Sequence, residues 1–428
     1  MTAASLDMPA RNLRLRDRAL RTLKVLQTTR RQRGTVAAGI FLARTLFRKG
    51  PLLVRHLRAV RGMAQLRANV RASRQTVPAS ILQVGVMVSG GLGDMLVIGR
   101  FLRDLGQAAP GMRLDIFMST PGMAAWAFRE IPGFRGAYHD VLFDSAIAEY
   151  DVALRISQFV VVYSERVRSE TLQAAGGMAQ AVEAIMRFRP EIDICVNHNP
   201  WLDNHLARIA TFHGATRRDF LHKIAAIPYG GDRLTVPLDV TILTRLGLQP
   251  GSYVTIHNGF DTGFLISGRQ ATKCYPHFSE VVALLKEYVP GITFVQIGAK
   301  TSLPIEGCDL MLIDRTTLDE AAGLIANAAM HIDNEGGLVH LASCVGVKSV
   351  VVFGPTPIDY FGYPSNVNVA PPVCGECWWM KPTWMDSCVK GYEAPSCMTQ
   401  QSPRLVAEHA RRLLLQLNPA VLVPKAAE

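Results

Sequence analysis

The 428-residue sequence predicts an α/β protein in which two doubly wound, Rossmann-like domains face a shared cleft, preceded by a basic helical extension. Two series of short apolar runs alternate with helix-like segments, a pattern typical of parallel sheets covered by helices on both faces. A stretch rich in glycine and proline separates the two series and indicates a domain boundary. The chain is also long enough for two cores.

The first domain is expected to span residues 81–228. It opens with Leu82–Val88, a continuous apolar run that is typical of a strand buried within a parallel sheet. A glycine loop and a helical segment follow this strand. The further elements expected are strands at Leu114–Met118, Ala137–Phe143 and Tyr150–Ile156, helices at Met95–Leu105 and Met123–Arg129, and a mostly helical stretch over Arg166–Ile224 that is interrupted at Ile192–Val196.

Residues 229–252 contain Tyr229-Gly230-Gly231-Asp232 and are expected to form the interdomain linker. The second domain then spans residues 253–417. Its expected strands are Tyr253–His257, Ile292–Ile297, Leu310–Ile313, Met330–Ile332 and Ser349–Phe353. Its expected helices are Phe278–Tyr288, Leu318–Ala329, Gly337–Val345 and Pro403–Leu417.

The extension, residues 1–80, accounts for the net positive charge of the chain, because the remaining residues are slightly acidic. It holds 18 Lys and Arg residues against two acids, Asp7 and Asp17, whereas the remaining residues hold 28 basic and 33 acidic side chains. Such a segment can bind anionic lipid head groups, nucleic acid or an acidic partner, or it can simply pack on the body as a solvated helical arm.

No transmembrane segment is expected, because the longest apolar stretch of the extension, Gly34–Ala43, is about half the length that spans a bilayer. No signal-peptide layout is recognisable either. We therefore expect a cytoplasmic protein without a nucleic-acid partner. Residues 1–75 either dock on the inner face of a membrane or on an acidic partner, or pack on the body.

The first motif that suggests chemistry is Ser89-Gly90-Gly91-Leu92-Gly93-Asp94, directly after the first strand. Gly91 and Gly93 let the backbone approach a ligand, and the helix that follows offers unpaired N–H groups to an anion. Asp94 would stand at the mouth of the cleft, where a carboxylate can take the proton of an incoming hydroxyl. The alternative is that Asp94 only caps the helix.

The second motif is Lys273-Cys274-Tyr275-Pro276, on the loop after the first strand of the second domain. A cation at this place can stabilise the charge that grows on a departing diphosphate. Arg269, four residues earlier, is a second candidate for this role. The alternative for both side chains is an ordinary surface position.

The third motif, Asp333-Asn334-Glu335-Gly336-Gly337-Leu338-Val339-His340, again carries a strand into a glycine turn and a helix. Its turn offers backbone donors through Gly336 and Gly337, and Glu335 can bind sugar or ribose hydroxyls. His340 lies one turn into the helix and either assists or is a satisfied core histidine. Phe353-Gly354-Pro355-Thr356-Pro357 follows the next strand and is expected to shape the same pocket through Gly354 and Thr356.

Taken together, these motifs resemble the family-nine glycosyltransferases, the ADP-heptose-dependent heptosyltransferases. That family has a Gly-Asp loop after its first strand, a lysine near a Trp-Pro pair, and an Asp-Ser/Thr-Gly-x-x-His helix start followed by Phe-Gly-Pro-Thr. The resemblance covers roughly residues 81–417 and implies the two-domain GT-B fold. It also implies that Asp94 is the base, that Lys273 binds the diphosphate, and that Glu335 through His340 form the donor-sugar pocket.

The sequence departs from the family pattern at two places. Tyr275 stands where the family has Trp before Pro276. The acidic-hydroxyl-glycine triplet is Glu335-Gly336-Gly337, so a longer acid replaces the usual one and the hydroxyl is lost. Both changes bear on which donor sugar the pocket accepts.

A fourth constellation is formed by Cys374, Cys377, Cys388 and Cys397 within the irregular segment 371–400. Four thiolates at this spacing suit a closed tetrahedral metal site, and disulfides are the weaker explanation in a reducing compartment. The segment resembles the family branch that glycosylates bacterial autotransporter proteins. That resemblance implies iron as an alternative to zinc as a structural metal.

The sequence thus predicts an inverting glycosyltransferase that uses an ADP-sugar, with ADP-heptose as the expected donor and no catalytic metal. The acceptor is a protein serine, a lipopolysaccharide core or another glycan, and a homo-oligomer is possible. Two other classes stay open: a sugar-nucleotide 2-epimerase, which needs no acceptor, and a non-catalytic scaffold that binds a sugar nucleotide.

Overall fold

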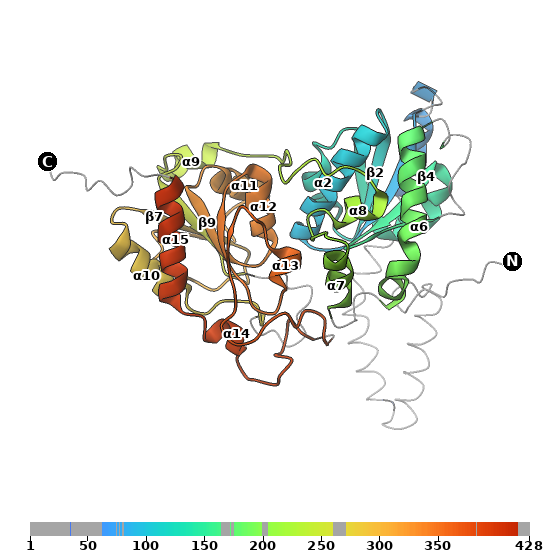
Figure 1. Ribbon diagram of the computed structural model, residues 1–428. Helices are drawn as coiled ribbons and strands as arrows, with labels where there is room; N and C mark the ends of the chain where they lie inside the picture. Colours follow the sequence, from blue (N-terminus) through green and yellow to red (C-terminus); the bar gives the residue numbers. More distant parts are fainter. Residues whose placement is uncertain are drawn as a thin grey trace.

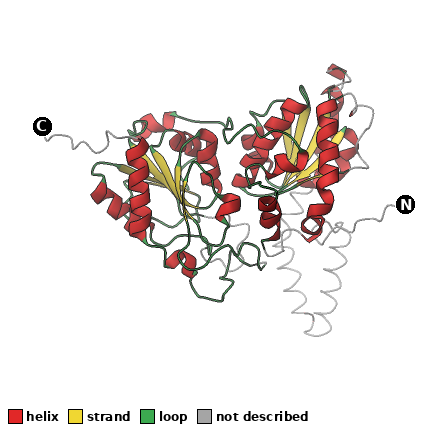
Figure 2. Cartoon of the chain, in the orientation of Figure 1, coloured by secondary structure: helices red, strands yellow, loops and turns green. Residues whose placement is uncertain are grey.

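The computed structural model describes Thr35 and residues 62–73, 75–76, 78, 81–163, 172, 175–198, 204–259, 271–381 and 383–417. Within these residues the chain forms two α/β domains side by side, joined by the segment that follows α8 (Figures 1 and 2). None of the described helices combines the length and the hydropathy needed to cross a bilayer. Most of the segment expected to dock on a membrane or acidic partner, residues 1–75, lies outside the described residues.

The first domain contains a five-stranded sheet in the order β3-β2-β1-β4-β5. The first four strands pair in parallel, and β5 runs antiparallel to β4. The strands are β1 (Gln83–Val88), β2 (Arg113–Met118), β3 (Phe134–His139), β4 (Val152–Ile156) and β5 (Val160–Val162). The larger helices are α2 (Leu92–Ala108), α3 (Pro121–Phe128), α6 (Gly176–His198), α7 (His205–Phe212) and α8 (Phe220–Ala225).

Two sequence expectations for this domain are wrong. The strand expected at Ala137–Phe143 ends at His139, because the His139 ring accepts a hydrogen bond from Val141 N–H and starts a 3-10 turn over Asp140–Leu142. The interruption expected at Ile192–Val196 is absent, since α6 continues through it. Its apolar residues recur at helical spacing and are buried on one face, namely Ile185, Ile192, Cys195 and Val196.

The second domain contains a six-stranded parallel sheet in the order β11-β10-β9-β6-β7-β8. The strands are β6 (Tyr253–Ile256), β7 (Thr293–Gly298), β8 (Leu310–Ile313), β9 (Met330–Asn334), β10 (Ser349–Val352) and β11 (Val367–Val369). The order of connection reverses between β6 and β9. In open α/β sheets the crevice beyond the carboxyl ends of two such strands is where ligands bind.

Helices cover both faces of this second sheet (Figure 1). Alternate residues of β10 enter different cores: Val350 and Val352 pack with α10 and α15, whereas Val351 belongs to the core shared with the first domain. The helices are α9 (Thr241–Leu246), α10 (Phe278–Tyr288), α11 (Leu318–Ala326), α12 (Gly337–Val345), α13 (Ile358–Phe361), α14 (Ser396–Thr399) and α15 (Pro403–Leu417). Helix α9 lies within residues 229–252, so the expected linker contains a short helix.

Helical residues 62–73, which the sequence assigned to the extension, pack on the first domain. Leu66 and Val70 have no exposed surface and share a cluster with Phe117, Phe143 and Tyr150. Burial of two branched apolar side chains stabilises the fold by a few kcal/mol, about 1.5–3 kcal/mol for each. This part of the extension therefore contributes to the stability of the first domain.

Replacing Leu66 with alanine should lower the free energy of unfolding by about 2–5 kcal/mol, because it leaves a cavity in a closed cluster. Urea unfolding measures this change. Arg71→Ala, at an exposed position of the same helix, is the matched control and should change the free energy by about 0.5 kcal/mol or less. Equal unfolding midpoints for the two variants would show that this helix is not part of the core.

Candidate active site

The two domains meet where the N-termini of α2 and α12 approach each other. Each helix follows the carboxyl end of a strand beside the reversal point of its own sheet, β1 and β9. A Cβ added to Gly337 would lie 3.2 Å from the Gly93 nitrogen, and one added to Gly93 would lie 2.6 Å from His340 Cδ2. Only glycine fits at this crossing, and the unpaired N–H groups of both helices converge on one region suited to an anion.

Asp94 stands in the first turn of α2, and two donors orient its carboxylate. Gly91 N–H donates to Oδ2 at 3.1 Å, and the Arg217 guanidinium lies 2.8 Å from Oδ1. The Asp94 side chain keeps a quarter of its surface exposed, so its remaining lone pairs are accessible. Asp94 thus does cap its helix, as the simpler interpretation held, and it also faces the region between the domains.

Arg217 is buried and ties Asp94 to the second domain. Its backbone N–H donates to the carbonyl of Tyr360 at 2.7 Å, across the interface. Burial disfavours the charged guanidinium, but the neighbouring Asp94 carboxylate outweighs this and the pKa of Arg217 is raised. The ion pair therefore persists, and it fixes the Asp94 carboxylate relative to both domains.

Lys273 and Glu335 come together in the second domain. Their side chains are 12% and 9% exposed and lie 3.6 Å apart, Nζ to Oε2. The structure thus brings together two residues that are 62 positions apart and that were selected from separate motifs. A diphosphate at the start of α12 would compete with Glu335 for the ammonium group and would leave the Glu335 carboxylate available to sugar hydroxyls.

His340 is buried in the first turns of α12, and its Nδ1 lies 2.6 Å from the Tyr363 hydroxyl. Burial, followed by the cations of Arg100, Arg217 and Lys273, holds the pKa of His340 well below its ordinary value. His340 is therefore a neutral imidazole at physiological pH. A Cβ added to Gly93 would lie 2.6 Å from His340 Cδ2, so the ring borders the start of α2 in the first domain.

Four polar side chains, each with a buried oxygen that is unpaired within the described part of the chain, lie at the carboxyl ends of strands in the second domain. Their buried oxygens find no hydrogen-bond partner among the described residues: Asn258 Oδ1, Ser302 Oγ, Asn334 Oδ1 and Thr356 Oγ1. Three of them follow β6, β7 and β10, and Asn334 is the last residue of β9, so they surround the reversal point of the sheet. An unsatisfied buried polar atom costs about 1–3 kcal/mol, so four of them in one region indicate a place shaped for a polar ligand.

A buried hydrogen-bond network around the Asp333 carboxylate supports these strand ends. His257 Nδ1 lies 2.9 Å from the Asp333 carboxylate, His331 approaches the same group, and Gly259 N–H donates to His257 Nε2 at 3.0 Å. Burial alone would raise the pKa of Asp333, but contacts with His257 and His331 lower it. The network joins the ends of β6 and β9 and so fixes the strand ends from which Asn258 and Asn334 extend.

Three predicted site residues remain: Gly336, Gly354 and Arg269. Gly336 is the extended residue that precedes α12, next to Gly337. Gly354 packs against the cysteine segment, because a Cβ there would lie 2.3 Å from Met398 Sδ and 3.3 Å from Cys397 Sγ. Arg269 lies outside the described residues.

The four clustered cysteines line one cavity of about 130 Å³, together with Thr272, Pro355 and Trp384. None of them forms a disulfide. Burial, and then the three neighbouring thiols, raise the pKa of Cys397 to about 12. In the described part of the chain, however, no three His, Cys, Asp or Glu side chains stand at metal-binding separations.

The cysteine segment is connected to the candidate site at two points. Thr272, next to Lys273, donates through its Oγ1 to the Trp384 carbonyl at 2.8 Å and through its N–H to the Met385 carbonyl at 2.8 Å. Glu376 N–H donates to the Gly354 carbonyl at 3.0 Å. Order in this segment therefore determines the position of both the lysine loop and the Gly354 loop.

Sequence reasoning missed several residues of the site: Arg100, Arg217, Asn258, Ser302 and Tyr363. Asn258 directly follows an expected strand, which is a signal that could have identified it. Arg217 lies between α7 and α8, and Tyr363 follows α13. No local pattern marks either, because tertiary packing alone brings them to the site.

Comparison with known proteins gives a match to one family model over part of the second domain. Residues 245–378 match the model of glycosyltransferase family 9 (heptosyltransferase). No curated protein matches the chain.

Among solved structures, the dodecameric iron-containing heptosyltransferase TibC of enterotoxigenic E. coli, in complex with ADP-D-β-D-heptose, is 15% identical. The match covers 79% of this chain and 77% of that chain with a TM-score of 0.52. ADP-heptose LPS heptosyltransferase II of E. coli is 17% identical over 78% of this chain and 99% of that chain, with a TM-score of 0.48. The similarity to TibC confirms the predicted fold.

Gly93→Ala should reduce activity strongly while leaving each domain folded, since the added methyl group collides with His340 across the interface. Gly106→Ala in the same helix is the control, because its Cβ would meet only Met112 Cε at 3.6 Å. That control should raise helix stability by up to about 1 kcal/mol. Circular dichroism and turnover measure both effects, and equal turnover in the two variants would exclude a tight crossing in the working enzyme.

Proposed function

We propose that this chain, which carries a glycosyltransferase family 9 domain, transfers a heptose from ADP-heptose to an acceptor hydroxyl with inversion at the anomeric carbon. The observation that supports this best is the convergence of Lys273, the glycine starts of two helices and Asp94 on one region between the domains. A cation and helix N-termini suit a diphosphate, and a carboxylate on the opposite side suits an activated hydroxyl.

The second domain binds the donor. The nucleotide occupies the rim formed by Asn258, Ser302, Asn334 and Thr356, whose buried oxygens lack partners among the described residues. The diphosphate lies at the start of α12 and replaces Glu335 as the partner of Lys273. Glu335 then hydrogen-bonds the sugar, and its longer side chain selects the donor.

The first domain presents the acceptor. Its hydroxyl oxygen forms a bond to the anomeric carbon from the face opposite the leaving group, while the bond from that carbon to the diphosphate oxygen breaks. The electron pair of the broken bond stays on the diphosphate, where Lys273 and the α12 N–H groups stabilise it. The hydroxyl proton passes to Asp94, which Arg217 and Gly91 hold in place.

The cysteine segment holds a structural metal, either iron or zinc, in this proposal. Four thiolates around one cavity are a donor set that both metals accept. Two non-glycine residues within the segment, Glu376 and Trp379, adopt left-handed backbone conformations, which persist only where other interactions fix them. The thiols would close around the ion by small side-chain movements, and the order they impose would extend to Lys273 through Thr272.

Asp94→Asn should lower sugar transfer by about 10²-fold or more, because the amide cannot accept the proton, while donor affinity changes by about threefold or less. Asp144→Asn, at an exposed position of the same domain, should leave both values unchanged. Mass spectrometry of acceptor proteins and glycans after incubation with ADP-heptose measures transfer and identifies the acceptor class.

The same reaction without acceptor separates the other classes. An epimerase would convert the donor alone into an isomeric sugar nucleotide, and a binding scaffold would release no ADP with any acceptor. Either result would contradict the proposed transfer, as would near-normal turnover by the Asp94→Asn variant.

Cys388→Ser should remove one metal ion per chain, lower the thermal midpoint and weaken ADP binding, because the ordered segment supports the lysine loop. Cys308→Ser, a partly buried thiol elsewhere in the same domain, is the control and should retain the metal. Elemental analysis of untagged protein, scanning calorimetry and ADP titration give the three readouts. Metal-free wild-type protein with full stability and four readily alkylated thiols would contradict a metal site.

A further inference from the structure

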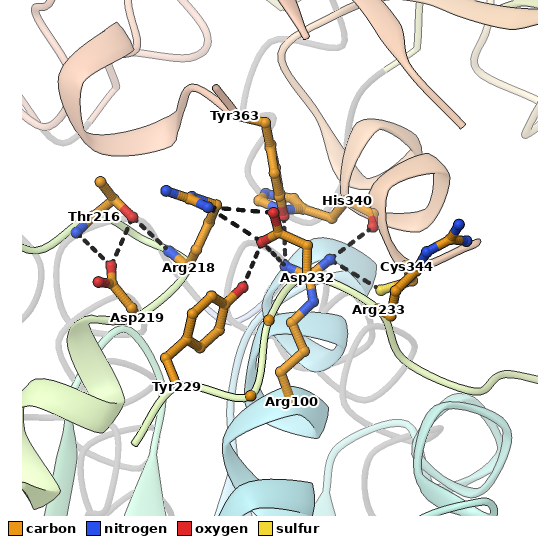
Figure 3. A network of polar contacts seen from close by, with 12 residues as sticks. Arg100, Thr216, Arg218, Asp219, Tyr229, Asp232, Arg233, His340, Cys344 and Tyr363 are labelled. Carbon is orange, nitrogen blue, oxygen red and sulfur yellow. Dashed lines mark hydrogen bonds and ion pairs between the residues drawn. The ribbon is translucent and has the colours of Figure 1, made fainter. Parts of the chain in front are cut away.

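A buried polar cluster joins the two domains beside His340, and its central residue comes from the first domain (Figure 3). Arg100, on α2, has no exposed side-chain surface. Its guanidinium donates to the Tyr363 hydroxyl at 2.7 Å, to the His340 carbonyl at 3.3 Å and to Cys344 Sγ at 3.1 Å. All three partners belong to the second domain.

The directions of these hydrogen bonds determine where the proton of His340 lies. A guanidinium only donates, so the Tyr363 oxygen accepts from Arg100 and its own proton needs an acceptor. His340 Nδ1, at 2.6 Å, is that acceptor. A proton on Nδ1 would instead make His340 a second donor to this oxygen and would leave the Tyr363 proton without an acceptor among the described contacts. The single proton of the neutral imidazole is therefore on Nε2.

The surroundings keep both groups neutral. Burial and the cations of Arg100, Arg217 and Lys273 lower the pKa of His340, as described above. Burial raises the pKa of Tyr363, although Arg100 opposes that shift. The Arg100-Tyr363-His340 chain consequently holds one arrangement of protons.

The Nε2 side of the ring faces the first domain. A Cβ at Gly93 would lie 3.3 Å from Nε2, so this nitrogen borders the N-terminal turn of α2, one residue from Asp94. An Nε2–H group here is a hydrogen-bond donor directed at the region between the domains. An oxygen of the bound donor, on the diphosphate or the sugar, is the acceptor that this position suits.

Arg100 is held by a third part of the chain, the linker. Asp232 lies 3.8 Å from its Nη1, and Tyr229 and Arg218 bind the same carboxylate. The guanidinium also lies 5.4 Å from the centre of the Tyr363 ring. The first domain, the linker and the second domain must all be in place for Arg100 to reach Tyr363.

We propose that Arg100 is a positioning residue which, through Tyr363, fixes His340 in the Nε2–H form, so that His340 can donate to the sugar nucleotide only when the two domains are closed on each other. The kinetic consequence rests on the proposed transfer function, whereas the proton arrangement does not. Arg100 itself touches neither substrate nor reacting atoms.

The test uses full-length protein with ¹⁵N-labelled histidine and the Tyr363→Phe variant, which keeps the ring but removes the hydroxyl. In the wild type, the His340 nitrogens, assigned by their loss in His340→Asn, should show a protonated Nε2 and an unprotonated Nδ1. Tyr363→Phe should give a mixture of the two neutral forms. It should also lower kcat about tenfold, the change expected from one lost neutral hydrogen bond, with KM for ADP-heptose within about twofold.

Tyr253→Phe is the matched control, because it removes a buried hydroxyl that donates to the Leu324 carbonyl and to no member of the Arg100-Tyr363-His340 chain. It should leave the His340 signals and kcat unchanged. A wild-type spectrum with the proton on Nδ1, or with both nitrogens protonated, would overturn the proposal. So would a Tyr363→Phe protein whose His340 signals match the wild type. The spectra test the proton arrangement even if the chain transfers no sugar, so the two proposals can fail separately.

Discussion

The contact between the glycine starts of α2 and α12 is the constraint on which the rest of the site depends. Gly93 and Gly337 bring two helix N-termini within van der Waals distance, so the backbone donors of both domains face one small region. Two helix N-termini carry partial positive charge, so burying further cations beside them would destabilise the fold unless acidic side chains pair with those cations. The chain supplies these acidic side chains: Arg217 is paired with Asp94, and Lys273 with Glu335. In the proposed reaction, the phosphates of a bound donor would neutralise the remaining positive charge at these helix ends.

The fold could be predicted largely from pattern, because buried parallel strands have an unmistakable composition. Strand β8 and helices α10, α12 and α15 lie within the bounds expected from sequence. The two wrong expectations concern the end of strand β3 and the continuity of helix α6. The His139 cap ended a strand early, and the run over Ile192–Val196 resembled an interruption although it continues one apolar face of α6.

The site was predictable only where a residue sits in a strand-end motif. Lys273 and Glu335 were selected separately, and the structure pairs them. Arg217 and Tyr363 carry no such signal, because each reaches the site from a loop whose path is set by the packing of distant helices. Helical residues 62–73 show the same limit, since the basic composition around Leu66 concealed an apolar contact with the first domain.

The cysteine segment and the interface cluster act on the site from outside it. Thr272 links the cysteine segment to the loop that carries Lys273. Arg100 links the interface cluster to His340 through Tyr363. Both connections join residues of the candidate site to parts of the chain outside it. If the proposed transfer holds, activity should depend on the contact between the domains and on the order of the cysteine segment, as well as on the reacting groups.

The most direct test of the account is a crystal structure of the chain with ADP-heptose, or with ADP alone, bound. The account predicts that the diphosphate lies at the N-terminus of α12, with a phosphate oxygen within hydrogen-bond distance of Lys273 Nζ and with the Lys273–Glu335 pair separated. A diphosphate bound instead at Gly90–Gly91 of the first domain, with that pair intact, would contradict it.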